Sequence, residues 1–303
     1  IPEDRRVMAF VGPSGAQYTF DVTKREHAYK VQALNQQDLD RNFCLATTAV
    51  FKWMQAARME LPWMQAGYRN FCEVEPKMTR RLLVGSQVIR LDRPGILGEA
   101  VDNEVTTTVE VGEIGRTTIE WRYKVAFGER QVATGSCVMI STAGTPGNFK
   151  PHPVPDDVKA LASPVASENA KFMKDTLASV PKQAVAGAYV LPITVRYSDE
   201  DVNKHANHSA QARFFEDAKE AVTYDESAGP ALRAIAEQQL EAIVISYAAE
   251  VSALDRLEVK VALSSDGSAL DVWVDRLQPN PTLVARGRMV CSGGKVPSSD
   301  DRR

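Results

Sequence analysis

The sequence predicts a chain of the α+β class, in which one long helix followed by antiparallel strands occurs twice. Two stripes of apolar residues at helical spacing, Leu45 to Ala57 and Ala210 to Val222, predict the two helices. After each stripe come apolar runs with a period of two, which is typical of strands. The order of the elements in the second half repeats the order in the first.

The composition is that of an ordinary soluble protein. The chain has 303 residues, 44% of them hydrophobic and 25% charged, which favours about two domains. A net charge of −3 gives no reason to expect a nucleic-acid partner, and no apolar run is long enough for a transmembrane segment. The four cysteines form no CxxC pair, so we expect no metal site, and Cys137 and Cys291 lie in apolar runs that favour burial. A reducing intracellular compartment is expected, with plastid and mitochondrion both compatible.

Residues 1–27 show no clear periodicity and are predicted to form an N-terminal arm. The first domain is predicted to span residues 28–141, with a strand, a loop and the first long helix at its start. A meander of antiparallel strands is expected after that helix, with turns at Gly112, Gly115 and Gly128. The expected strands lie near Leu82–Leu91, Ala100–Val111, Thr117–Phe127 and Gln131–Ile140.

A proline-rich linker and crossover is predicted over residues 142–185. The second domain is predicted to span residues 186–293, and residues 294–303 form a polar tail. Its elements are expected in this order: strand Val190–Tyr197, helix Ser209–Tyr224, then strands Ala242–Val251, Leu257–Leu263, Ala269–Asp275 and Thr282–Cys291.

The internal repeat can be aligned at two places. Lys52–Met59 matches Arg213–Glu220 at an offset of 161 residues (213 − 52), and Val132–Met139 matches Val284–Cys291 at an offset of 152 (284 − 132). A few shortened loops would absorb the difference between the two offsets. The weak identity but shared order of elements indicates a duplicated domain.

The loop between the first strand and the helix of the second domain, Ser198 to Asn207, is the candidate site. Asp201, Asn203 and His205 occupy alternate positions there, which places a carboxylate, an amide and an imidazole beside one another for acid–base or nucleophilic chemistry. For Asp201 alone, a role as a turn or cap residue is the alternative. Asp199 and Glu200 are expected to be solvated.

The matching loop of the first half has lost most of this pattern. At the 161-residue offset, Asp40 matches Asp201, but Cys44 stands at the position of His205 and Ala46 at that of Asn207. We therefore expect one active half and one degenerate half.

The segment SDEDVNKHANH, Ser198 to His208, resembles the D-x-N-x-H-x-N-N motif of plant and bacterial acyl-acyl-carrier-protein thioesterases. The resemblance is close over residues 195–221 and loose over 28–292. It implies two hotdog domains in one chain, each a long central helix wrapped by an antiparallel sheet, and no cofactor. The pattern departs from the family at His208, where the family has a second Asn, and at Gln211, where it has Tyr.

The resemblance also implies the roles of single residues. The Asp201 carboxylate would attack the thioester or activate water, with Asn203 and His205 to orient it. Glu250 matches the Glu of the family's Glu-Cys pair and would assist, although Val251 replaces the Cys. Residues proposed to bind the substrate and to form the wall of an acyl channel are Asn207, Phe214, Phe215 and Ala218.

The leading hypothesis is hydrolysis of an acyl thioester carried by acyl-carrier protein or CoA. The alternative is a catalytically degenerate, thioesterase-like subunit of a larger assembly. A hotdog dehydratase is a third possibility that fits less well, and either a homodimer or membership of an assembly is compatible with the sequence. Four basic residues near the loop would help to receive a phosphopantetheine arm or carrier protein: Arg196, Lys204, Arg213 and Lys219.

Overall fold

The computed structural model describes residues 7–11, 17–21, 26–31, 46–59, 73–75, 78–92, 104–145, 148–159, 165–201 and 204–295. The chain divides into two compact units. The first unit comprises Ile1–Asn35, Lys52–Gln87 and Gly98–Lys171, and the second comprises Gln36–Phe51, Val88–Leu97 and Phe172–Arg303. The domain boundaries that the sequence suggests remain predictions. Among the described residues, no helix is long and apolar enough to cross a membrane.

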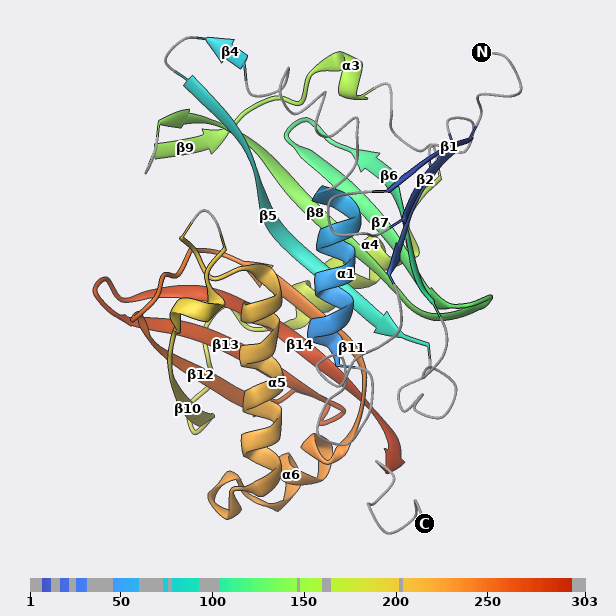
Figure 1. Ribbon diagram of the computed structural model, residues 1–303. Helices are drawn as coiled ribbons and strands as arrows, with labels where there is room; N and C mark the ends of the chain where they lie inside the picture. The colour runs from blue at the N-terminus through green and yellow to red at the C-terminus, as the bar shows by residue number, and fades with distance from the viewer. Residues whose placement is uncertain are drawn as a thin grey trace. The chain divides into compact units, whose positions relative to one another are not determined.

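The first unit is built on an antiparallel sheet with the strand order β1-β2-β3-β6-β7-β8-β5, to which β4 adds beside β5 and β9 beside β8 (Figure 1). The elements that lie wholly or mainly in this unit are β1 Val7–Val11, β2 Gln17–Asp21, β3 Glu26–Val31, α1 Thr47–Met59, β4 Glu73–Glu75, β5 Met78–Leu91, β6 Val105–Ile114, β7 Thr118–Phe127, β8 Arg130–Thr145, β9 Asn148–Pro151 and α3 Asp156–Lys159.

The predicted N-terminal arm contains two strands. β1 pairs with β2, and β2 pairs with β3, so this segment extends the sheet of the first unit. Each strand has only five residues. Strands of that length are too short for their alternation to stand out from the surrounding sequence, which explains why the periodicity was not visible.

The predicted stripe of the first helix is buried. Ala49, Val50, Trp53, Met54 and Ala57 of α1 are all shielded from solvent. The Trp53 ring meets that of Phe127 on β7 edge to face, with the centroids 6.3 Å apart, so the helix is packed on the sheet through this stripe.

The last turn of α1 places Arg58 in the interior of the first unit. Its Nη1 donates to Tyr123 Oη at 3.1 Å and to Cys137 Sγ at 3.2 Å, and no carboxylate of the described residues pairs with it. Burial raises the pKa of Tyr123 and that of Cys137, so both stay protonated near neutral pH. Cys137 is buried as predicted, but it also serves as a hydrogen-bond acceptor.

The second unit has the strand order β11-β14-β13-β12-β10, and neighbouring strands in this order are antiparallel (Figure 1). Helix α5 packs against strands β10 and β12 of this sheet. The elements that lie wholly or mainly in this unit are α4 Glu168–Ser179, β10 Tyr189–Thr194, α5 His208–Tyr224, α6 Pro230–Ala236, β11 Gln238–Tyr247, β12 Arg256–Leu263, β13 Ala269–Gln278 and β14 Thr282–Lys295.

The two sheets share one topology. The order β3-β6-β7-β8-β5 in the first unit corresponds to β10-β12-β13-β14-β11 in the second. In both, the last three strands form a meander, but the strand that follows the helix pairs with the last strand of that meander. The prediction of a meander in chain order is therefore wrong for one strand of each unit, because β5 lies beside β8 and β11 lies beside β14. The helix crosses one face of the sheet, so the chain re-enters the sheet on the far side of the meander.

One close approach on β14 requires a glycine. A Cβ atom at Gly287 would lie 1.9 Å from the backbone oxygen of Val244 on β11 and 3.0 Å from Cε1 of Phe215 on α5. The oxygen belongs to the paired strand, so it cannot move away without breaking the sheet.

We therefore expect Gly287→Ala to destabilise the protein by about 2 kcal/mol or more, since overpacking against a fixed backbone is costly. The measurement is the urea concentration at half-unfolding. Gly85→Ala is the matched control, because its nearest neighbour is the flexible end of the Ile140 side chain at 2.9 Å. A midpoint for Gly287→Ala that is no lower than that of Gly85→Ala would contradict the prediction.

Candidate functional site

The loop before α5 forms a narrow hairpin. Asn207 N donates to Asp199 O at 3.0 Å, and Asp201 N donates to His205 O at 3.0 Å. The turn is closed by Lys204 N, which donates to Asp201 O at 3.0 Å, and Lys204 has a positive φ of 62°. The backbone thus places Asp201 and His205 opposite one another. Asn203 lies outside the described residues, and its role remains a prediction.

A second loop, which follows β11, is bound to this hairpin by hydrogen bonds. Three bonds join them: Ala206 N to Val251 O at 2.7 Å, Ala253 N to Glu200 Oε1 at 2.7 Å, and Ser252 Oγ to Lys204 O at 3.2 Å. Because the bonds involve Val251, Ser252 and Ala253, the three residues that directly follow Glu250, they hold Glu250 beside the hairpin.

His205 and Glu250 meet across these two loops. His205 Nε2 lies 3.3 Å from Glu250 Oε2, and the two side chains are 33% and 56% exposed. Glu250 was expected in a strand, but β11 ends at Tyr247, so it lies on a loop. A nitrogen that faces a carboxylate carries the hydrogen, which makes Nδ1 the basic nitrogen of a neutral His205. That Nδ1 is buried, and no described residue forms a hydrogen bond with it.

Asp199 is buried rather than solvated, with 1% of its surface exposed. Its carboxylate accepts from Arg196 N at 2.9 Å and from the Arg213 guanidinium. Burial alone would raise the pKa of Asp199, but the bonds from Arg196 N and Arg213 outweigh it and lower that pKa. Glu200 is half-buried, and its Oε1 accepts the hydrogen bond from Ala253 N of the second loop.

The pairing of Asp199 with Arg213 is a feature that the sequence did not indicate. Arg213 lies in the second turn of α5, so the ion pair joins the start of the hairpin to the helix that follows it. A spacing of this kind across a loop follows no helical or strand periodicity, and only the fold of the loop brings the two charges together.

Asn207 is the N-cap of α5. Its Oδ1 accepts from Ala210 N at 2.8 Å and from Ser209 Oγ at 2.6 Å. The cap role considered for Asp201 thus belongs to Asn207. Its amide nitrogen is the part of the side chain that a substrate could use, and the predicted substrate-binding role remains a prediction.

The three predicted lining residues of the acyl channel are buried on α5. Phe214, Phe215 and Ala218 each expose 1% or less of their surface. Phe215 faces the sheet at Gly287. Their burial is sufficient to make them core residues, and contact with an acyl chain remains a prediction for all three.

Two of the four basic residues near the loop are unsuited to receive a substrate. Arg213 is paired with Asp199 and with Asp217, and Lys219 is 8% exposed. Lys204 is exposed, and Arg196 is 63% exposed although its Nε also lies 3.7 Å from Asp199.

Two sheets of one topology, with α1 between β3 and β5 in the chain and α5 between β10 and β11, define a protein with the double hotdog fold of the acyl-acyl-carrier-protein thioesterases. No protein-family model and no curated protein matches the sequence.

Among solved structures, the chain is similar to an acyl-acyl-carrier-protein thioesterase from Bacteroides thetaiotaomicron, with 15% identity, a TM-score of 0.62 and coverage of 89% of this chain and 99% of that chain. It is also similar to a 12:0-acyl-carrier-protein thioesterase from Umbellularia californica, with 15% identity, a TM-score of 0.62 and coverage of 88% and 97%. At these identities the likeness shows the fold.

Proposed function

We propose that the chain hydrolyses acyl thioesters at the site formed by Asp201, His205 and Glu250. The observation that carries the proposal is the contact of His205 Nε2 with Glu250 Oε2 at 3.3 Å, beside the turn that bears Asp201. The proposal is supported by two loops far apart in the chain, which bring Glu250 to His205 and the backbone of Asp201 opposite that of His205. The double hotdog fold supports the same reaction class.

In this reaction the Asp201 carboxylate attacks the thioester carbonyl or removes a proton from the attacking water. When water attacks, the C–S bond breaks, the sulfur takes up the proton that the water gave up and leaves as a thiol, and the acyl group becomes a carboxylic acid. When Asp201 attacks, the C–S bond breaks to leave an acyl anhydride on Asp201, and a water molecule then hydrolyses this anhydride and supplies the protons for the thiol and the acid. His205 orients the reacting groups, and Glu250 holds His205 through Nε2. Helix α5 begins at His208, and the partial positive charge at its N-terminus would stabilise the negative charge that develops on the carbonyl oxygen.

We propose acyl-acyl-carrier protein or acyl-CoA as the substrate class. The names of the two similar structures concern thioesters of the carrier protein, and both carriers hold the acyl group on the same phosphopantetheine thiol. The acyl group would extend toward the apolar face of α5 at Phe214, Phe215 and Ala218.

The first test is release of free thiol from acyl-CoA and acyl-acyl-carrier protein by the purified chain. Glu250→Gln is expected to lower kcat by about tenfold to a hundredfold, because a neutral amide no longer orients and polarises His205. Glu237→Gln, an exposed acid at the end of α6, is the matched control and should retain the rate.

The alternative of a degenerate subunit gives a different outcome. In that case the wild-type chain releases no thiol from either carrier, and Glu250→Gln has no rate to lower. Absence of thiol release across several acyl lengths would overturn the proposed function.

A further inference from the structure

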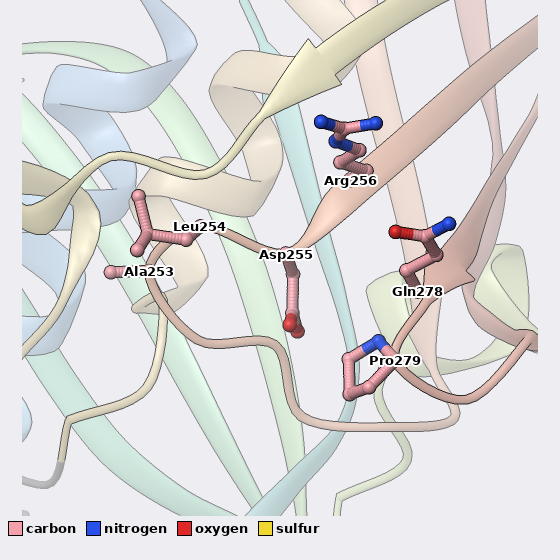
Figure 2. A pocket seen from close by; sticks show the side chains of 6 residues that line it. All are labelled: Ala253, Leu254, Asp255, Arg256, Gln278 and Pro279. Atoms are coloured by element: carbon pink, nitrogen blue, oxygen red, sulfur yellow. The ribbon is translucent and has the colours of Figure 1, made fainter.

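A pocket of about 490 Å³ lies beside the loop that carries Glu250 (Figure 2). It is lined by Ala253, Leu254, Asp255, Arg256, Gln278 and Pro279. Arg256 at the start of β12 and Gln278 at the end of β13 are partners in the antiparallel register, and Figure 2 shows Leu254 on the opposite side of the pocket.

Two polar groups of the pocket are available to a ligand. Arg256 is exposed, and none of the described residues forms an ion pair or hydrogen bond with its guanidinium. Gln278 is also exposed, and its amide has no partner among those residues. The neighbouring Asp255 does not neutralise Arg256, because its carboxylate accepts from Ser252 N at 3.1 Å and from Arg276 Nη1 at 3.4 Å.

The apolar side of the pocket is held in an unfavourable backbone conformation. Leu254 has a φ of 71° and exposes 63% of its surface. A bulky residue in the left-handed region costs free energy, and an apolar side chain held out in water adds no packing. The conformation is maintained by Leu254 N, which donates to Val195 O at 2.8 Å. Such strain is concentrated at ligand-binding sites.

The pocket is joined directly to the proposed catalytic loop. Arg276 Nη1 donates both to Glu250 O, at 3.1 Å, and to the Asp255 carboxylate. The guanidinium of Arg276 therefore holds both the Asp255 side chain, which lines the pocket, and the backbone of Glu250.

We propose that this pocket binds the phosphate end of the 4′-phosphopantetheine arm that CoA and acyl-carrier protein share. Arg256 pairs with the phosphate, the Gln278 amide meets an amide of the arm, and Leu254 with Pro279 contacts its aliphatic part. The proposal rests on the proposed function for the identity of the ligand. The pocket proposal and the proposed function concern different residues, because none of the residues that line the pocket takes part in the hydrolysis.

Binding of the free arm tests the pocket without any reaction. Calorimetry should show that 4′-phosphopantetheine binds the wild-type chain about tenfold more tightly than pantetheine, because a charge-assisted contact to phosphate is lost in the second ligand. Arg256→Gln should remove this difference, whereas Arg116→Gln, the same change at an exposed arginine of the first unit, should preserve it. Equal affinity of the wild-type chain for the two ligands, or an unchanged difference in Arg256→Gln, would overturn the proposal.

Kinetics then distinguish the carriers and separate this proposal from the proposed function. Arg256→Gln should raise KM about tenfold for acyl-CoA, acyl-acyl-carrier protein or both, with kcat unchanged, and should leave hydrolysis of S-acylpantetheine unaffected. A rise in KM for one carrier alone identifies that carrier as the source of the arm. If the wild-type chain releases no thiol, the proposed function fails, and the calorimetric difference alone decides the pocket. A wild-type rate with no change in KM for either carrier would overturn the pocket and leave the proposed function standing.

Discussion

Asp201→Asn is expected to lower kcat for thioester hydrolysis by about a thousandfold or more while the fold survives. Asparagine has nearly the same shape as aspartate, but its neutral amide can neither attack a thioester carbonyl nor remove a proton from water. The hydrogen bonds that form the turn use the backbone N–H and C=O of Asp201, at 3.0 Å each, so the substitution leaves them in place.

The measurement compares thiol release by Asp201→Asn and by the wild-type chain at saturating substrate. Asp156→Asn is the matched control, because Asp156 is an exposed acid of the first unit whose partner is Lys159 one turn away. Circular dichroism and the melting temperature should be close to wild type in both variants. An Asp201→Asn variant that keeps the wild-type rate would contradict the assignment of the catalytic carboxylate.

A double variant adds a sharper test of the same site. If Asp201, His205 and Glu250 act as one unit, Glu250→Gln should have little further effect once Asp201 is replaced, because the remaining rate no longer depends on the imidazole. If the fall in kcat of the double variant equals the product of the falls in the two single variants, Glu250 acts on a separate step.

The sequence predicted the elements of the fold better than their neighbours in the sheet. Helix α5 and strands β12 to β14 follow from apolar spacing, which depends only on nearby residues. The pairing of β11 with β14 does not, because no local pattern specifies which strand lies beside which. The short helix α6 was also missed, since its seven residues contain too few turns for a stripe to be recognised.

The candidate site shows the same limit at the level of single residues. Alternate polar positions before a helix indicated Asp201 and His205, and the resemblance indicated Glu250, which the structure places beside His205. The burial of Asp199 could not be inferred, because an acidic run in a loop is normally solvated. It depends on the Arg213 side chain folding back over the loop from α5.

The consequence of that burial is the second large effect that we expect. Asp199→Ala should lower the free energy of unfolding by about 2–3 kcal/mol, because it leaves the Arg196 N–H and the guanidinium of Arg213 without their shared acceptor. The loss should be smaller than for a fully buried ion pair, because the Arg213 side chain is 34% exposed and water can solvate its guanidinium once the carboxylate is gone. Asp199→Asn retains a carbonyl acceptor and should recover part of this stability.

Asp199 is also expected to act as a positioning residue for the reaction. Its backbone oxygen accepts from Asn207 N, so loss of the side-chain anchor loosens the hairpin that carries Asp201 and His205. A displacement of about 1 Å at such a site costs on the order of a hundredfold in rate. At a temperature where both proteins are folded, Asp199→Ala should lower kcat with little change in KM, and Asp199→Asn should recover part of kcat. An equal rise in KM for both variants with unchanged kcat would contradict a positioning role.

The pH dependence of stability distinguishes the charge of Asp199 from its shape. Because the folded state lowers the pKa of this carboxyl below its ordinary value of 3.8, ionised Asp199 stabilises the fold above that value. The stabilisation is lost as pH falls through the lower, folded-state pKa. The wild-type chain should therefore unfold at higher urea concentration than Asp199→Asn at pH 7, and this advantage should shrink as the pH falls below about 4. An advantage that is the same at neutral and acid pH would mean that the carboxylate is held by its shape and hydrogen bonds alone, without a contribution from its charge.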